Sequence, residues 1–159
     1  MAYILDTNIL IHKVRDSIVW QHIEKEYFPK GIKRNAFVSV VTIGEIRSFG
    51  RRNNWGGGKL AELKKFFSKL GVIYLRGDDI YAAYAQIDTY SQNKHKSRTL
   101  PPKYSARNMG KNDLWIAATA HAMGYDLIST DADFQHLDGV FFNFIYIDIA
   151  KIIKESKDI

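Results

Sequence analysis

One stretch in the last third of the chain constrains the fold most: a helix-like segment followed at once by a strand-like segment that ends in acidic residues. The helical segment Asp113–Met123 is rich in alanine, and Gly124, a residue typical of helix ends, follows it. The strand-like segment 125–130 leads directly into Asp131 and Asp133. A helix leading into a strand is half of a βαβ unit, and open α/β sheets bind ligands beyond the carboxyl ends of their strands. We therefore expect these two carboxylates at the edge where such a fold carries out chemistry.

Strand-like and helix-like runs alternate along the rest of the chain. This alternation predicts an α/β protein with a parallel sheet and helices on both faces. The connection Arg47–Gly58 is basic and rich in glycine, and it lacks the spacing of a phosphate-binding loop. The other predicted strands are Tyr3–Leu5, Ala36–Thr42, Val72–Leu75 and Phe144–Ile149, and the other predicted helices lie near 17–28, 60–70 and 79–91.

Four acidic residues share one place in this predicted architecture. Asp6 ends the first strand, Glu45 follows the second, Asp113 opens the late helix, and Asp131 ends the strand after it. The carboxyl ends of parallel strands gather on one edge, so we expect these side chains to lie near one another. A cluster of like charges is costly unless a cation neutralises it. Oxygen ligands without histidine or cysteine favour Mg²⁺ or Mn²⁺, ions that assist phosphoryl transfer.

Each of these acids also has a purely structural interpretation. With Thr42 as the helix cap, Glu45 has the spacing of a capping box, in which its carboxylate bonds back to the cap amide. Asp113 in the first turn of a helix is favoured by the helix dipole alone. The structural interpretation weakens when all four acids fall at elements that face the same edge.

The totals indicate one soluble globular domain at about 1–150, with a basic insertion at about 93–109 and a charged C-terminal tail, 151–159, that we expect to fray. The 159 residues include no cysteine, which excludes disulfides and thiolate–zinc sites and is compatible with a reducing cytosol. No run is long and apolar enough for a spanning helix, and the N-terminal apolar run is broken by Asp6 and Asn8, which favours a strand over a signal peptide. We expect a cytoplasmic protein without a membrane partner.

The charge balance favours a polyanionic partner. The 23 Lys and Arg against 17 Asp and Glu give a net charge of +6. No acidic residue lies between Thr89 and Asn112, so we predict phosphate contacts from this segment, and the alternative is a flexible, solvated loop. Its basic residues are Lys94, Lys96, Arg98, Lys103, Arg107 and Lys111.

Four successive motifs resemble the signatures of PIN domains, most closely those of VapC-like toxins of bacterial type II toxin–antitoxin pairs. The motifs are Ile4–Asn8, Ser39–Ile46, Asn112–Ala118 and Ile128–Phe134, and together they cover essentially the whole chain in the right order. The resemblance implies a three-layer α/β/α sandwich with a central, mostly parallel sheet of about five strands. It also implies an endoribonuclease that uses Mg²⁺ or Mn²⁺ to cleave RNA, forms homodimers and is inhibited by a small antitoxin protein.

The resemblance assigns roles to individual residues. Asp6, Glu45, Asp113 and Asp131 match the family's catalytic acidic metal ligands, and Asp133 matches an acid that assists them. The basic insertion is larger than in compact members, so neither the RNA target nor the antitoxin contacts carry over through it. Residues matching polar positions that orient a carboxylate or a water are Thr7, Asn8 and Thr130.

Three other functions remain as rivals. A receiver-type phosphoacceptor needs an acidic pair after the first strand and a lysine after a late one, and the chain has a single Asp6 and Thr130 there. A phosphatase of the Asp-x-Asp type fails at Asn8. A non-catalytic or housekeeping PIN module that binds or processes RNA without an antitoxin is the serious competitor, because binding needs the basic surface and not the acids.

Overall fold

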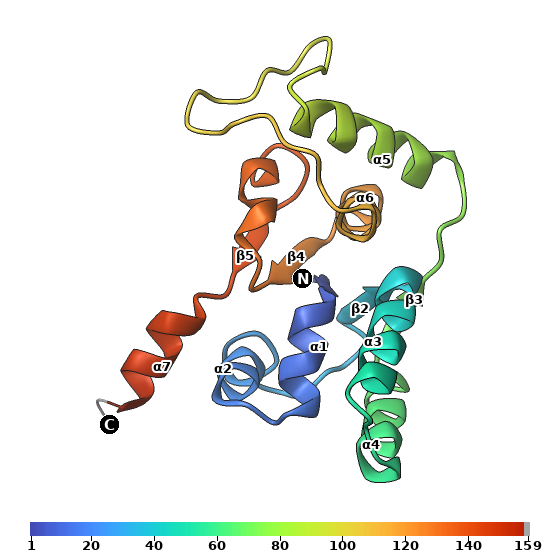
Figure 1. Ribbon diagram of the computed structural model, residues 1–159, viewed down its shortest axis with the longest axis vertical. Helices are drawn as coiled ribbons and strands as arrows, with labels where there is room; N and C mark the ends of the chain where they lie inside the picture. Colours follow the sequence, from blue (N-terminus) through green and yellow to red (C-terminus); the bar gives the residue numbers. More distant parts are fainter. Residues whose placement is uncertain (158–159) are drawn as a thin grey trace.

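The computed structural model describes residues 1–157 and is built on one five-stranded sheet in which every neighbouring pair of strands is parallel. The spatial order of the strands is β3-β2-β1-β4-β5, so the first strand of the chain lies at the centre (Figure 1). Its apolar side chains are all buried, as a central strand requires. The strands are β1 (Tyr3–Leu5), β2 (Ala36–Ser39), β3 (Gly71–Ile73), β4 (Asp126–Ser129) and β5 (Phe144–Tyr146).

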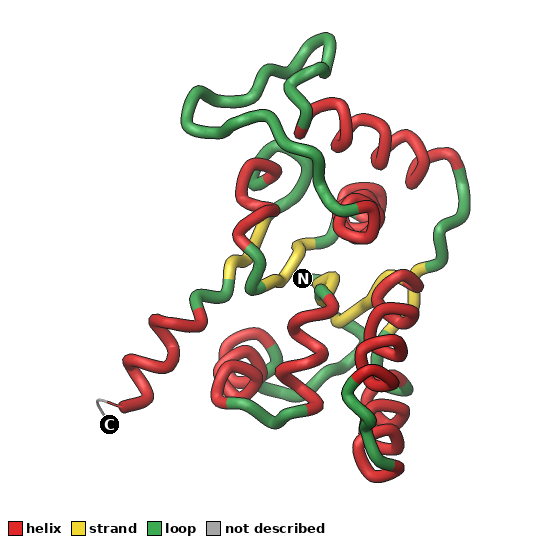
Figure 2. Tube along the Cα trace, viewed as in Figure 1, coloured by secondary structure: helices red, strands yellow, loops and turns green. Residues whose placement is uncertain are grey.

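Helices cover both faces of the sheet and complete the predicted three-layer sandwich (Figures 1 and 2). Successive strand residues point to opposite faces, so Leu5 contributes to one hydrophobic core and Ile4 to the other. One core includes α1 (Thr7–Val14), α2 (Ile18–Tyr27), α3 (Val40–Arg52), α4 (Gly57–Phe67) and α7 (Ile149–Lys157). The other includes α5 (Asp78–Ser91), α6 (Lys111–Met123) and the 3-10 helix η1 (Ala132–Leu137).

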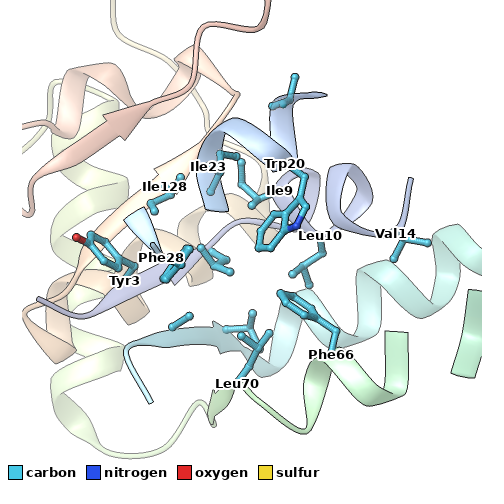
Figure 3. Close-up of a cluster of buried hydrophobic side chains, with 14 of the residues drawn as sticks. Tyr3, Ile9, Leu10, Val14, Trp20, Ile23, Phe28, Phe66, Leu70 and Ile128 are labelled. Carbon is cyan, nitrogen blue, oxygen red and sulfur yellow. The ribbon is translucent and has the colours of Figure 1, made fainter. Parts of the chain in front are cut away.

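Aromatic packing anchors the first of these cores (Figure 3). The rings of Trp20 in α2 and Phe66 in α4 meet edge to face with centroids 5.4 Å apart. Ile9 and Leu10 of α1 are fully buried in the same core. This packing fixes α1 on the sheet, and α1 begins directly after Asp6.

The second strand ends three residues earlier than predicted, which changes the interpretation of Glu45. Ser39, not Thr42, caps α3, because its hydroxyl accepts a hydrogen bond from the Val41 amide at 3.3 Å. Thr42 lies inside the helix and is buried. The capping-box explanation for Glu45 is therefore wrong, and its carboxylate has different partners.

The glycine-rich segment Arg47–Gly58 is largely helical rather than a connection. Helix α3 continues to Arg52, and α4 begins at Gly57. A Cβ atom on Gly50 would lie 2.9 Å from the Trp55 ring, so this glycine lets the turn fold back against the helix. Tertiary packing of one tryptophan thus overrides the low helix propensity of glycine.

The predicted fraying tail is an amphipathic helix over the residues that the structure describes. Helix α7 runs along α2 and buries Ile152. The physical reason for the helix is the spacing of Ile149 and Ile152, which lie one helical turn apart among charged residues. The last two positions, 158–159, lie outside the described residues. Within residues 1–157, no helix has the length and apolar character needed to cross a membrane.

Candidate active site

Asp6 lies at the carboxyl end of the central strand, where its backbone and side chain are both held. Its amide donates to the Ile128 carbonyl of β4 at 3.1 Å, which extends the β1–β4 pairing to this residue. One carboxylate oxygen caps α1 by accepting from the Thr7 amide at 2.6 Å, and the other accepts from the Ser129 hydroxyl at 2.6 Å. The residue is only 5% exposed. Burial raises the pKa of this carboxyl to about 7, against its two hydrogen bonds and with help from the charges of Asp113 and Glu45.

Glu45, in the second turn of α3, is held from two sides by neutral donors. The Thr7 hydroxyl donates to Oε1 at 2.7 Å, and the Asn112 side-chain amide donates to Oε2 at 3.0 Å. These partners belong to α1 and α6, so three helices meet at one carboxylate. Neither donor carries a charge, so the negative charge of Glu45 stays available to a cation.

Asp113 lies in the first turn of α6, behind a helix cap at Gly110 that offers no side-chain hydrogen bond. A Cβ atom on Gly110 would lie 2.8 Å from Asp113 Oδ2, so a larger residue there would crowd the carboxylate. The pKa of Asp113 is raised to about 6. Burial is the largest cause, and the negative charges of Asp131, Glu45 and Asp133 are smaller causes in the same direction. Asp113 is thus the acid that experiences the charges of most of the others.

Ser129 at the end of β4 joins the two halves of the site. Its hydroxyl donates a hydrogen bond to Asp6, and its oxygen accepts from the Asp131 amide at 2.9 Å and from the Asn8 side-chain amide at 3.1 Å. Asn8 Oδ1 in turn accepts from the Thr130 amide at 3.4 Å. These contacts fix the backbone that carries Asp131 relative to the strand that carries Asp6.

Asp133 differs from the other acids because it has a cationic partner. Its Oδ1 lies 3.2 Å from Arg107 Nη1, and its side chain is 70% exposed. Its amide donates to Asp131 Oδ1 at 2.9 Å, which makes Asp131 the cap of η1. Asp133 therefore lies at the rim of the site, between the acids and the basic segment.

The basic segment is docked on the protein and is not a free, solvated loop. The connection from 92 to 110 runs over η1 (Figure 1, yellow) and buries Leu100 and Met109. Tyr104 donates its hydroxyl to the Gln135 carbonyl at 3.1 Å. Beneath it, Ser91 and His136 Nε2 are 2.7 Å apart, and burial together with the Arg107 charge lowers the pKa of His136 to about 4.

The basic residues of this segment, which are predicted to contact nucleic acid, have different surroundings in the structure. Arg98 lies over the Phe141 ring and Lys103 over the Tyr104 ring, at 5.4 and 5.0 Å from their centroids. Lys96 is exposed, and Lys111 begins α6 at the acidic edge. Of the six basic residues predicted, Arg107 alone has an ion pair with a site acid within residues 1–157.

The arrangement has the donor chemistry of a site for a hard divalent cation, in an open form. The charge of Asp113 contributes to the raised pKa of Asp6, and neither acid has a cationic partner among the residues that the structure describes. Across residues 1–157, no three acidic or histidine side chains lie close enough together to form a ready metal cluster. An ion such as Mg²⁺ keeps several waters and binds few carboxylates directly, so an open, all-oxygen set suits it. A hollow of about 440 Å³, lined in part by Glu45 and Asn112, leads away along α3 past Ser48 and Arg52.

Sequence reasoning missed two residues that organise these acids. Asn112 and Ser129 stand in the recognised motifs but were given no role, although each directly holds a carboxylate. The one indication in the sequence is their position, immediately before Asp113 for Asn112 and two residues before Asp131 for Ser129. Their partners lie 67 and 123 positions away in the chain, so no local pattern names them.

Comparisons with known proteins identify the family and the fold of the chain. The family model for the PIN domain matches residues 3–140. A VapBC2 complex from Rickettsia felis, bound to a DNA fragment from its promoter, contains a chain that superposes with a TM-score of 0.72 at 18% identity, covering 93% of this chain and 100% of that one. VapBC-1 from nontypeable Haemophilus influenzae gives 0.65 at 21% identity, with 92% and 98% covered. FitAcB from Neisseria gonorrhoeae gives 0.64 at 19%, with 90% and 96% covered. A search of curated proteins finds no match.

Proposed function

This chain belongs to the PIN domain family, and from that premise we propose that it is a metal-dependent endoribonuclease that hydrolyses RNA phosphodiester bonds. The observation that carries the proposal is the unbalanced charge of Asp6 and Asp113. Asp6 is held by two hydrogen bonds, the pKa of both acids is raised, and neither has a cationic partner among the described residues. A structural acid is normally paired or solvated, whereas a divalent cation would relieve this repulsion.

In this proposal Asp6 and Asp113 hold Mg²⁺ or Mn²⁺, and Glu45 and Asp131 complete the site directly or through water. The chemistry that such an ion supplies is activation of water and neutralisation of charge on the phosphate. The hydrogen bonds from Thr7 and Ser129 keep Asp6 in one orientation, and those from Thr7 and Asn112 do the same for Glu45. The protein therefore supplies carboxylate oxygens that are already oriented, so they need little reorganisation when a cation binds.

We further propose that the substrate is RNA and that the chain acts as the toxin of a type II toxin–antitoxin pair in the cytoplasm. The net charge of +6 and the docked basic segment support a polyanionic substrate. The similar solved structures come from toxin–antitoxin complexes, which supports a small antitoxin protein as partner. A homodimer is part of the same proposal.

The decisive experiment compares Asp113→Asn with a matched control. Purified protein is incubated with a pool of cellular RNAs and Mg²⁺ or Mn²⁺, and products are resolved by gel. We expect Asp113→Asn to reduce cleavage about 100-fold or more, the scale on which removal of one preorganised charge-stabilising group acts. Asp79→Asn makes the same change in the first turn of α5 at an exposed position and should cleave like wild type.

Equal cleavage by wild type and Asp113→Asn, or no cleavage of any RNA in the pool, would refute the nuclease. In the second case, retained RNA binding would favour the non-catalytic PIN module. The toxin role has a separate test: expression of the wild-type chain in bacteria should stop growth, and expression of Asp113→Asn should not. Cleavage without growth arrest would favour a housekeeping RNA-processing role.

A further inference from the structure

Arg107 occupies a position that its sequence context does not explain. Its amide donates to the Ser91 carbonyl at 2.8 Å, so the backbone of the basic segment is attached there to the end of α5. Two residues further on, Met109 is buried. The side chain then reaches Asp133 at 3.2 Å and remains 32% exposed. A basic side chain in a solvated loop would have none of these restraints.

The ion pair leaves most of the guanidinium free. An arginine has five N–H donors, and the contact with Asp133 uses Nη1 alone. A surface hollow of about 210 Å³ adjoins the same side chain, lined by Gln92, Lys94, Ala106, Arg107 and Asn108. Lys94 is held at this hollow by its hydrogen bond to Gln92 at 3.0 Å. The two cations and the Asn108 amide around this small hollow are donors suited to an anion, whereas the Gln92 amide nitrogen donates to Asp88 Oδ1 at 3.0 Å.

The position of this hollow relates it to the acidic site. Arg107 forms an ion pair with Asp133, and the Asp133 amide donates a hydrogen bond to Asp131. The charge of Asp133 also contributes to the raised pKa of Asp113. An RNA phosphate that approaches four carboxylates is repelled by them. A cation held at the rim by Asp133 compensates for this repulsion.

We propose that Arg107 and Lys94 form a subsite for an RNA phosphate next to the scissile one, and that Asp133 is a positioning residue for Arg107. This inference rests on the proposed nuclease function and assigns its substrate contact. It divides the basic segment: Lys103 and Arg98 cover aromatic rings and stabilise the loop, whereas Arg107 and Lys94 bind the substrate. It also assigns Asp133 to RNA binding instead of metal binding.

The test measures binding of a fluorescein-labelled single-stranded RNA to cleavage-deficient Asp113→Asn protein, by anisotropy over a series of salt concentrations. Adding Arg107→Gln should weaken binding about tenfold and reduce the slope of log K against log salt by roughly 0.7, the share of one phosphate contact. Adding Lys94→Gln, an exposed change without packing consequences, should act in the same direction. Lys103→Gln should cost less than about twofold.

Arg34→Gln is the matched control, since it removes the same charge from an exposed arginine before β2, at the opposite edge of the sheet. It should leave both affinity and salt slope unchanged. Equal losses for Arg107→Gln and Lys103→Gln would overturn the subsite in favour of diffuse attraction. Absence of RNA binding by the parent protein would instead count against the proposed function itself.

The role of Asp133 is separated by a double-mutant cycle and by metal affinity. Asp133→Asn should weaken RNA binding by about threefold, and this loss should disappear when Arg107→Gln is already present. Calorimetric titration of Mn²⁺ into otherwise wild-type protein should give the same affinity with and without Asp133→Asn. Persistence of the loss in the Arg107→Gln protein, or weaker Mn²⁺ binding, would show that Asp133 acts on the metal and overturn the assignment.

Discussion

The acidic edge around Asp6 and the docked segment above His136 both bury a titratable side chain. The surroundings of the two side chains differ in charge. Burial shifts both groups toward their neutral forms: the pKa of Asp6 rises to about 7, and that of His136 falls to about 4. At pH 7 His136 is neutral and hydrogen-bonded to Ser91. Asp6 is about half ionised, and further acids lie around it.

The difference distinguishes a buried group with a structural role from one arranged for function. The neutral His136 ring is hydrogen-bonded to Ser91, so this contact contributes to stability. Around Asp6 like charges remain close, and two hydrogen bonds favour the ionised form that burial disfavours. A protein tolerates such a conflict where a cation or substrate resolves it.

Asp6→Asn should have the largest effect, both on the free energy of unfolding and on cleavage. The folded pKa of Asp6 lies above the unfolded value, so its stabilising contribution is full below about pH 4 and is lost as pH rises through about 7. Wild type should therefore lose up to about 4 kcal/mol of unfolding free energy relative to Asp6→Asn between pH 4 and 8. Urea unfolding at each pH measures this loss, and cleavage by Asp6→Asn should fall at least about 100-fold. A constant difference across the pH range would contradict the buried, uncompensated acid.

Ser91→Ala should release the docked segment while sparing the acidic edge. It leaves His136 Nε2 buried without a partner, which costs about 1–3 kcal/mol of unfolding free energy. Hydrogen exchange should accelerate over residues 92–110 and not over α1. Ser48→Ala, at an exposed helical position, is the control. Equal acceleration in α1 would mean that the two regions are not energetically separate.

Asn112→Ala changes the acidic edge, because it removes the hydrogen bond to one carboxylate oxygen of Glu45. We expect kcat for RNA cleavage to fall about tenfold with little change in stability, because Asn112 is exposed and its bond to Glu45 orients the carboxylate. Asn143→Ala, exposed at the start of β5, should have no effect. Wild-type kcat in Asn112→Ala would remove Asn112 from the site.

The smallest effect concerns His136 and has the opposite pH dependence. Because its folded pKa lies below the unfolded value, its contribution is present above about pH 6.5 and is lost as pH falls toward 4. His136→Gln should therefore lose less stability than wild type between pH 6.5 and 5. Thermal melts in matched buffers measure this difference, and parallel curves for the two proteins would place His136 outside the buried network.

Sequence reasoning located the strands and the acids because these depend on local signals. An apolar run closed by a polar residue fixes the end of β1 at Asp6, and the alanine-rich run with its following glycine fixes α6. It misplaced elements where side-chain packing decides, as at Gly50, whose missing Cβ accommodates Trp55. It also could not indicate the contact of Asp133 with Arg107, because the two residues are 26 positions apart.

The central position of β1 has a consequence for how the protein is made. Asp6 is synthesised 123 residues before Ser129, whose hydroxyl holds its carboxylate. Strand β1 can pair with β2 early, whereas β4 and Asp131 are available only after the helices between β2 and β4 have been made. Contacts of such long sequence separation form late in folding. A nascent or prematurely released chain therefore lacks the assembled acidic edge, and the proposed cleavage of RNA is withheld from the cell until the whole fold is present.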